Sequence, residues 1–402
     1  MSTVSGKSTE RSGDGRTHPV ALLRLGFRPF YLLAGIYAAI SIPAWTGMYF
    51  GLLPMPVLFP PGWWHAHEMI FGYTAAVITG FLFTAVPNWS GRPTPTGVPL
   101  ALLAVLWIAG RVLINLDIVP VTITVIVDCA FLFLAAGALF VPIIGARNYR
   151  NYGVIAVVLA MACANLGLHL SYMKVISYPP DLTLSLGLNA IILIMVIIGG
   201  RVIPFFTANV LQGIEIRRGT ISDILAIISV VLLLIASAVP LLRSLVPELS
   251  IIASILNGWR MRSWRFAMIR QRPILWILHL GYAWIVLGLL LAGLAAWVPA
   301  MPRSAFIHAI TVGAVGSLTL GMMTRTALGH SGRPLELARP VVWSYYLISI
   351  AAVARILGTI VPANLFKVTI IISVITWSTA FLIFLYVYWP ILTRPRADGK
   401  PG

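Results

Sequence analysis

Apolar residues fill long segments of this chain, and short polar or proline-rich segments separate them. Each apolar segment has about the 20 residues that an α-helix needs to cross the hydrocarbon core of a bilayer. The segments are too long and too uniformly apolar for the roughly ten-residue alternating strands of a membrane barrel. The pattern predicts twelve membrane-spanning helices, at 27–52, 66–87, 99–116, 120–143, 152–176, 182–209, 223–246, 249–266, 274–297, 304–327, 341–361 and 366–391.

The spans follow one another with short connections, which predicts an all-α polytopic membrane protein with a single transmembrane domain over residues 25–392. Residues 1–24 are polar and rich in Ser, Gly and Arg, and we expect a disordered cytoplasmic tail there. Because this segment lacks the apolar core and cleavage site of a secretory signal, the first span is expected to remain in the mature protein. Residues 393–402 are expected to form a second cytoplasmic tail.

The charged residues predict the orientation of the spans. The formal net charge is +17, although only 10% of the residues are charged. Lys and Arg gather in alternate loops and in both tails, whereas the remaining loops hold only Lys174, Arg243, Arg303 and Lys367. By the positive-inside rule, both termini are predicted to be cytoplasmic. The basic charge therefore indicates a protein oriented in a lipid bilayer, and we expect no nucleic-acid partner.

Polar chemistry concentrates in the stretch GWWHAHEMIFGY, residues 62–73, at the outer mouth of the second span. Ionisable groups inside a membrane are costly, so they commonly mark functional sites. The predicted topology places four of the seven histidines in the outer half of the membrane, namely His65, His67, His169 and His308. The cytoplasmic side is predicted to hold His279 and His330, and the N-terminal tail holds His18.

The sequence also contains an internal repeat. Adding 241 to positions in the second span carries His67 onto His308, Gly72 onto Gly313, Gly80 onto Gly321, and the loop 90–93 onto 331–334, both of which read SGRP. Gly80 plus 120 falls on Gly200 in the sixth span, a weaker match without a histidine. Glycines and SGRP loops also serve as generic packing and loop residues. The common spacing nevertheless indicates duplication, with the chain built as three four-helix units.

Imidazole is a common ligand of haem iron and of copper. Equivalent helices would bring His67 and His308 to equal depth, so we predict these two first as haem ligands. His65 lies two positions before His67, so both serve one metal only if the backbone is extended there; on a regular helix they face different partners. Each histidine could instead be an interfacial anchor or a polar contact between helices. His279 and His330 could form a second, inner pair.

Other polar residues in the spans have plainer interpretations. Arg111 and Asp128 lie at similar depth on adjacent helices, which predicts a structural ion pair. Arg355 lies deeper, where it could meet a haem propionate or another bound anion. The two cysteines, Cys129 and Cys163, have no metal-binding spacing and are expected to pack in the helix bundle.

Two polar residues could orient histidine ligands. Asn165 precedes His169 by one helical turn and could hold that imidazole, and Glu68 could do the same for a neighbouring histidine or carry protons. The chain has no CxxCH sequence for covalent haem attachment and no P-loop, so soluble nucleotide chemistry is not expected.

Three segments resemble the signature regions of the NnrS family of bacterial membrane proteins: GWWHAHEMIFGYTAAVITGFLFTAVPNWSGRP, GGRVIPFFTANVL and HAITVGAVGSLTLGMMTRTALGHSGRPL. The resemblance extends over residues 24–392. It implies a twelve-helix protein of the bacterial inner membrane that contains haem b and copper. It also implies a role in nitric oxide metabolism and in protection from nitrosative stress, often beside denitrification enzymes.

The three-unit organisation is also similar to the catalytic subunit of haem-copper oxidases. In that family helices 2 and 10 supply the low-spin haem ligands, which would correspond here to His67 or His65 and to His308. The chain departs from that family because it has no adjacent His-His pair and no histidine in the sixth span. Copper would therefore need other ligands, and we expect His65 and His169 first, followed by His279 and His330.

We hypothesise from the sequence a haem and copper membrane protein acting on nitric oxide, with candidate cofactor residues His65, His67, His169, His308 and Arg355. A transporter or metal-handling permease is an alternative, because duplicated helical units also suit alternating access. A sensor that binds nitric oxide without turnover is a third. The sequence identifies neither an electron donor nor the reaction.

Overall fold

The computed structural model describes residues 21–56, 58–211, 216 and 221–400, and within these residues every regular element is a helix. The expected tail at 1–24 lies outside the described residues except for a short turn, η1 (Ala21–Leu23). The longer helices are α1 (Phe27–Tyr49), α3 (Ala75–Ser90), α4 (Gly97–Leu113), α5 (Val121–Gly145), α6 (Tyr152–Tyr172), α7 (Pro180–Val210), α8 (Ile221–Ala238), α9 (Val246–Arg262), α11 (Pro273–Leu294), α13 (Ser317–His330), α14 (Arg339–Leu357) and α15 (Ala363–Thr393).

Shorter helices complete the chain. Two lead into long helices through a π-helical segment: α2 (Pro61–His67) continues into η2 (Glu68–Thr74), and α12 (Arg303–His308) continues into η5 (Ala309–Gly316). The others are η3 (Tyr149–Asn151), η4 (Pro240–Leu245) and α10 (Phe266–Ile269). Helices α2, α7 and α11 have a proline in their first turn. The missing N–H of proline removes no intrahelical hydrogen bond at that position.

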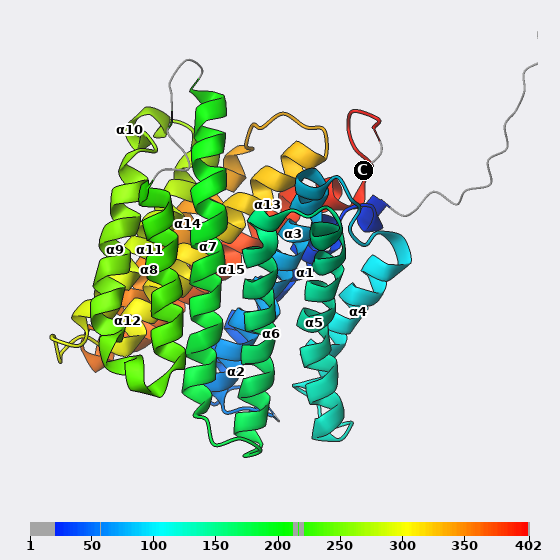
Figure 1. Cartoon of the computed structure of the whole chain (residues 1–402). Coiled ribbons are helices and arrows are strands. Elements are labelled where there is room, and N and C mark those ends of the chain that lie inside the picture. Colours follow the sequence, from blue (N-terminus) through cyan, green and yellow to red (C-terminus); the bar gives the residue numbers. More distant parts are fainter. Residues whose placement is uncertain (1–20, 57, 212–215, 217–220, 401–402) are drawn as a thin grey trace, which may run out of the picture.

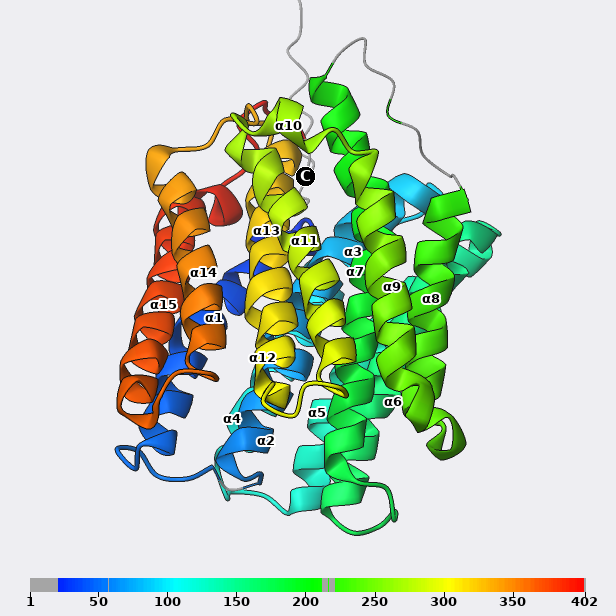
Figure 2. The ribbon, with the colours of Figure 1, turned by 90° about the vertical axis from the view of Figure 1, so that its left-hand side faces the viewer.

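The predicted spans are confirmed. Eleven helical rods among the described residues are long and apolar enough to cross a membrane, and the shorter apolar α4, with 17 residues, corresponds to the remaining predicted span, the third in chain order. The chain is therefore a multi-pass membrane protein. Figures 1 and 2 show the rods running side by side, with the connections gathered at the two ends of the bundle. The first and last long helices, α1 and α15, pack against each other, and Arg28 near the start of α1 donates to the carbonyl oxygen of Leu392 near the end of α15.

The structure supports the duplication of the second and tenth spans. Adding 241 to η2 gives 309–315, and the second π-helical segment, η5, occupies Ala309–Gly316. The same offset carries α4 onto 338–354, close to α14, and α5 onto 362–386, which begins one residue before α15 and otherwise lies within it. The sixth span, α7, is a continuous α-helix without a π segment. Because π segments are rare and concentrate at functional sites, two at matching positions single out the regions that follow His67 and His308.

Candidate functional site

His65 and His67 face different partners. Both lie in α2, which is helical across the two positions, so the extended backbone that would let them share one metal is absent. Two residues on a helix are separated by about 200°, so the side chains leave the helix on nearly opposite sides. His67 enters a buried polar cluster, and His65 lines a cavity. The two histidines therefore belong to separate candidate sites.

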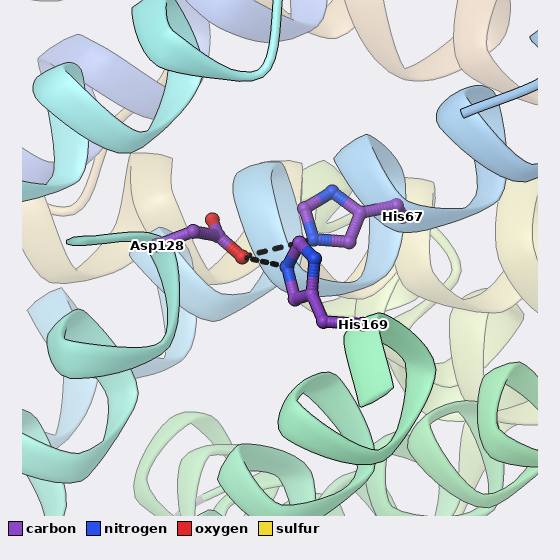
Figure 3. Close-up of side chains that lie close together, drawn as sticks. All are labelled: His67, Asp128 and His169. Atoms are coloured by element: carbon purple, nitrogen blue, oxygen red, sulfur yellow. Dashed lines mark hydrogen bonds and ion pairs between the residues drawn. The ribbon is translucent and has the colours of Figure 1, made fainter. Parts of the chain in front are cut away.

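The first site is a polar cluster that joins α2, α5 and α6, and Figure 3 shows its three central side chains. The Oδ2 atom of Asp128 lies 3.1 Å from His67 Nε2 and 2.8 Å from His169 Nε2. Asn165 completes the cluster, since its Oδ1 is 2.9 Å from His67 Nε2 and its Nδ2 donates to Asp128 at 2.8 Å. All four side chains are buried. Hydrogen bonding of this density in an apolar bundle is stabilising only when every partner is satisfied.

The partners of His67 define its state in the structure. His67 Nδ1 lies 2.8 Å from Glu68 Oε1, while Nε2 faces Asp128 and Asn165 Oδ1. When Glu68 and Asp128 are ionised, all three partner atoms are acceptors, so in that state both ring nitrogens donate and the ring is an imidazolium. Glu68 therefore orients the imidazole that precedes it, which is one of the two roles expected from the sequence. Asn165 contacts His67 and Asp128, whereas the sequence suggested that it would hold His169.

Arg111 on α4 links the two carboxylates of the cluster. Its guanidinium pairs with Asp128, which confirms the predicted ion pair, and its Nε lies 3.2 Å from Glu68 Oε2. Tyr37 on α1 also donates to Glu68. Two carboxylates are thus balanced by Arg111 and the His67 imidazolium. Such balance is what allows charges to remain inside an apolar bundle.

The three ligand-type side chains of the cluster lie close enough to hold a metal ion. Nitrogen atoms of His67 and His169 and an oxygen of Asp128 are all within 4.8 Å of one another. The ring of Phe59 covers them, with its centroid 5.2 Å from each imidazole centroid. Two imidazoles and a carboxylate are a ligand set that suits copper, zinc or iron.

The second site is a cavity of about 250 Å³ between the second, tenth and neighbouring spans. His65 from α2, His308 from α12 and Arg355 from α14 line it, and its remaining lining is largely apolar and aromatic. The cavity lies beside η2 and η5, so both π segments contribute to its wall. A concave apolar pocket with a few convergent polar groups is typical of a cofactor or small-molecule site.

The polar groups of this cavity are incompletely satisfied. His308 Nδ1 lies 2.6 Å from the carbonyl oxygen of Ser304, so Nδ1 donates and Nε2 carries the lone pair. The His65 ring stacks on Trp45 with centroids 4.4 Å apart, and its buried Nδ1 has no hydrogen-bond partner among the described residues. Arg355 Nη1 is likewise buried without a described acceptor. Both residues line the cavity, so a ligand bound there would contact side chains whose hydrogen-bonding capacity is not fully used.

The histidines predicted from the sequence therefore group differently from the expectation. The structure does not bring His67 and His308 together; it places His308 with His65, and His67 with His169. The reason is that the repeat aligns backbone positions, whereas the partners of each imidazole lie on other helices. Adding 241 to Asp128 gives Thr369, so the third unit lacks the acid that holds His67.

The inner histidines have separate surroundings. His279 on α11 contacts the carbonyl oxygens of Leu275 and Trp264, at 3.1 and 3.4 Å from its Nδ1 and Nε2. His330 ends α13 with its ring 6.1 Å from that of Phe27. These contacts do not join the two histidines.

Sequence reasoning missed two aromatic residues of these sites, Tyr37 and Trp45, because nothing in the first span distinguishes them from ordinary packing residues. The two cysteines are free. Cys129 is buried as expected for packing, whereas Cys163 lies on the exposed side of α6, so the expectation that it packs inside the bundle is wrong.

Comparison with known proteins gives one family. A family model described as NnrS protein matches residues 21–396, nearly the whole chain. No curated protein matches the sequence. The matched range includes both histidine sites and both π-helical segments.

Proposed function

The chain belongs to the NnrS family, and we propose that it handles nitric oxide at a haem b held in the cavity between His65 and His308. Family membership fits a role in the nitric oxide response in general, with binding of metal or haem. In this proposal the protein lies in the bacterial inner membrane with both termini in the cytoplasm. It protects the cell from nitrosative stress, often beside denitrification.

The observation that carries the proposal is the convergence of His65 and His308 on one cavity from two duplicated helices. Two imidazoles from facing helices can hold a planar macrocycle between them. The Ser304 carbonyl fixes the His308 tautomer so that Nε2 carries the lone pair that iron requires. The donor set therefore fits haem. The group would supply an iron centre that binds nitric oxide or passes electrons.

The rest of the cavity also suits haem. Arg355 has a buried Nη1 without a described acceptor, and a propionate would provide one. The volume of about 250 Å³ lies below the roughly 300–1,000 Å³ of typical ligand pockets. Binding of the macrocycle therefore requires flexible lining side chains, such as Met69, to change rotamer.

The two ligands would not be equivalent. A hydrogen bond to the outer nitrogen of a ligating imidazole fixes the ring and raises its basicity, and His308 has this support, whereas His65 does not. If haem were bound here, His65 and His308 would hold it, with His65 the less firmly supported of the two, and the iron would supply a centre for binding nitric oxide. His65 is the ligand expected to exchange.

We assign the copper of this proposal to the cluster of His67, Asp128 and His169. Glu68 holds Nδ1 of His67, which leaves Nε2 free for a metal once its proton is displaced. The proton that makes His67 an imidazolium carries one positive charge, so a monovalent copper ion in its place preserves the charge balance with Arg111 and the two carboxylates. This assignment replaces His65, the first copper candidate from the sequence, with His67.

Separate losses of the two metals test the proposal. The detergent-purified protein is expected to show a haem absorption band and bound copper. His308→Ala should abolish the haem band and leave copper in place, whereas His169→Gln should lose copper and retain haem. His65→Ala should retain haem with an altered band and bind nitric oxide faster, because the exchangeable ligand is gone. Absorption spectroscopy, metal analysis and stopped-flow mixing with nitric oxide measure these outcomes.

The same samples separate the alternatives. A full haem band in His308→Ala would overturn the haem assignment, and full copper occupancy in His169→Gln would overturn the copper assignment. Substrate flux into liposomes by a protein without a chromophore would favour a transporter. A spectral change with nitric oxide but no product would favour a sensor. His18→Ala in the N-terminal tail is the matched control and should change neither metal.

A further inference from the structure

A second cavity, of about 340 Å³, opens between the C-terminal ends of α3, α7 and α13, which the predicted topology places on the cytoplasmic side. It lies at the end of the bundle opposite to His65 and His308, and neither the haem nor the copper proposal uses it. Its polar lining is Thr84, Asn88, Arg325, Thr326 and His330. None of the described residues that line it is acidic, so the cavity is a basic site without a carboxylate of its own.

Arg325 is the main charged group of this cavity. Its exposed fraction is only 7%, and its guanidinium carbon lies 3.6 Å above the centre of the Phe206 ring. Its Nε and Nη1 are buried without a hydrogen-bond partner among the described residues. A buried guanidinium without acceptors carries a desolvation cost of several kcal/mol, and stacking on an aromatic ring offsets only about 0.5–2 kcal/mol of it.

Other buried arginines of the chain have acceptors. Arg260 donates to Asp223 at 2.6 Å and to the Val196 carbonyl at 2.8 Å, and Arg28 donates to the Arg394 carbonyl at 2.7 Å. The fold therefore supplies partners where a buried arginine is structural. Arg325 differs because it lines a cavity and because its Nε and Nη1 have no acceptor among the described residues, so the acceptor it lacks is expected from a ligand.

We propose that this inner cavity binds a small, planar, monovalent oxyanion of the carboxylate or nitrate class on Arg325. A planar guanidinium presents parallel N–H donors that match two oxygens of such an anion. One negative charge balances the one fixed positive charge. Asn88 and Thr326 line the same cavity and offer further donors, while Phe206 holds the guanidinium from one face. The proposal does not depend on haem or copper.

The test measures anion binding to the full-length, metal-loaded protein in detergent at constant ionic strength. Sodium nitrate and sodium acetate should each raise the melting temperature of the wild-type protein saturably, whereas sodium chloride should not. Arg325→Gln should lose the shift, with affinity reduced by at least about tenfold, or 1.4 kcal/mol. Arg325→Lys keeps the positive charge but lacks the planar pair of N–H donors. It should bind the anion more weakly than wild type but better than Arg325→Gln. Arg339→Gln, an exposed arginine at the start of α14, is the control and should retain the full shift.

The variants also report on folding without added anion. Because Arg325→Gln removes a desolvated charge that lacks a partner, it should be no less stable than wild type under that condition. Absence of a saturable shift with nitrate and acetate would overturn the proposal, and so would an equal shift in Arg325→Gln. A phospholipid that copurifies with wild type and is lost in Arg325→Gln, detected by mass spectrometry, would identify a headgroup phosphate as the occupant and would likewise overturn it.

Discussion

The two histidine sites differ in what their polar atoms face. Around His67 the chain supplies the partners itself, since Glu68, Asp128 and Asn165 contact both ring nitrogens and Arg111 balances the carboxylates. His65, His308 and Arg355 line a cavity, and within the described part of the chain His65 Nδ1 and Arg355 Nη1 have no hydrogen-bond partner. Each site takes one histidine from α2: His67 belongs to the polar cluster and His65 lines the cavity. Both nitrogens of His67 have partners from the chain, whereas Nδ1 of His65 has none among the described residues. His169 Nδ1 and Arg111 Nη1 in the first site also lack a described hydrogen-bond partner, so the contrast concerns the two imidazoles of α2 rather than every polar atom around them.

Removing Asp128 should have the largest effect on stability, because Asp128 is the shared partner in the first site. Asp128→Ala leaves Arg111 and the His67 imidazolium without their shared acceptor, and losing one partner of a buried ion pair costs about 3–5 kcal/mol. Thermal unfolding in detergent should therefore show a large loss of stability. Asp117→Ala, at an exposed loop position, is the matched control and should unfold like the wild type. Equal melting of the two variants would show that the cluster does not stabilise the fold.

A smaller change compares how tightly the two regions are packed. A Cβ added at Gly72 would lie 2.7 Å from Arg111 Nη1 and 3.2 Å from Glu68 Oε2, whereas one added at Gly62, beside the cavity, meets nothing within 4 Å. Gly72→Ala should therefore cost about 1–3 kcal/mol of unfolding free energy through overpacking. Gly62→Ala should be neutral or stabilising by up to about 1 kcal/mol, because alanine favours the helix.

The pair of glycine variants is informative because the chemical change is identical. Denaturant unfolding of both proteins gives the difference directly. If Gly72→Ala unfolds at the same denaturant concentration as Gly62→Ala, the side chains around Gly72 have room to adjust, and the cluster is not packed as closely as the distances indicate.

The sequence predicts the spans well because hydrophobic length is a local property. Each rod needs about 20 apolar residues, and the prolines and charges between rods mark the ends. The ion pair of Arg111 and Asp128 was predictable for a related reason, since charges at similar depth on neighbouring helices need partners. The 241-residue offset was also visible, and it identified the two spans that carry the π segments.

The grouping of the histidines could not be predicted in the same way. Which side of α2 each imidazole occupies depends on helical phase, and the partners come from helices far away in sequence, such as Asp128 on α5 and Asn165 on α6. The repeat aligns His67 with His308, but only the first of these has an acid nearby. A duplicated backbone therefore carries two different chemistries because the surrounding side chains have diverged.

The smallest predicted effect concerns Trp45, which stacks on the ligand expected to exchange. If His65 ligates haem weakly because its Nδ1 lacks support, the stacked ring at 4.4 Å is what keeps it near the cavity. An aromatic pair contributes about 0.5–1.5 kcal/mol, so Trp45→Leu should raise the fraction of haem that lacks this ligand by up to about tenfold. Absorption spectra and the association rate of nitric oxide measure that fraction. Trp343→Leu, at an exposed position on α14, should leave both unchanged. A Trp45→Leu protein with wild-type spectra and rates would mean that His65 is held by the iron itself, and the asymmetry between the two ligands would then be absent.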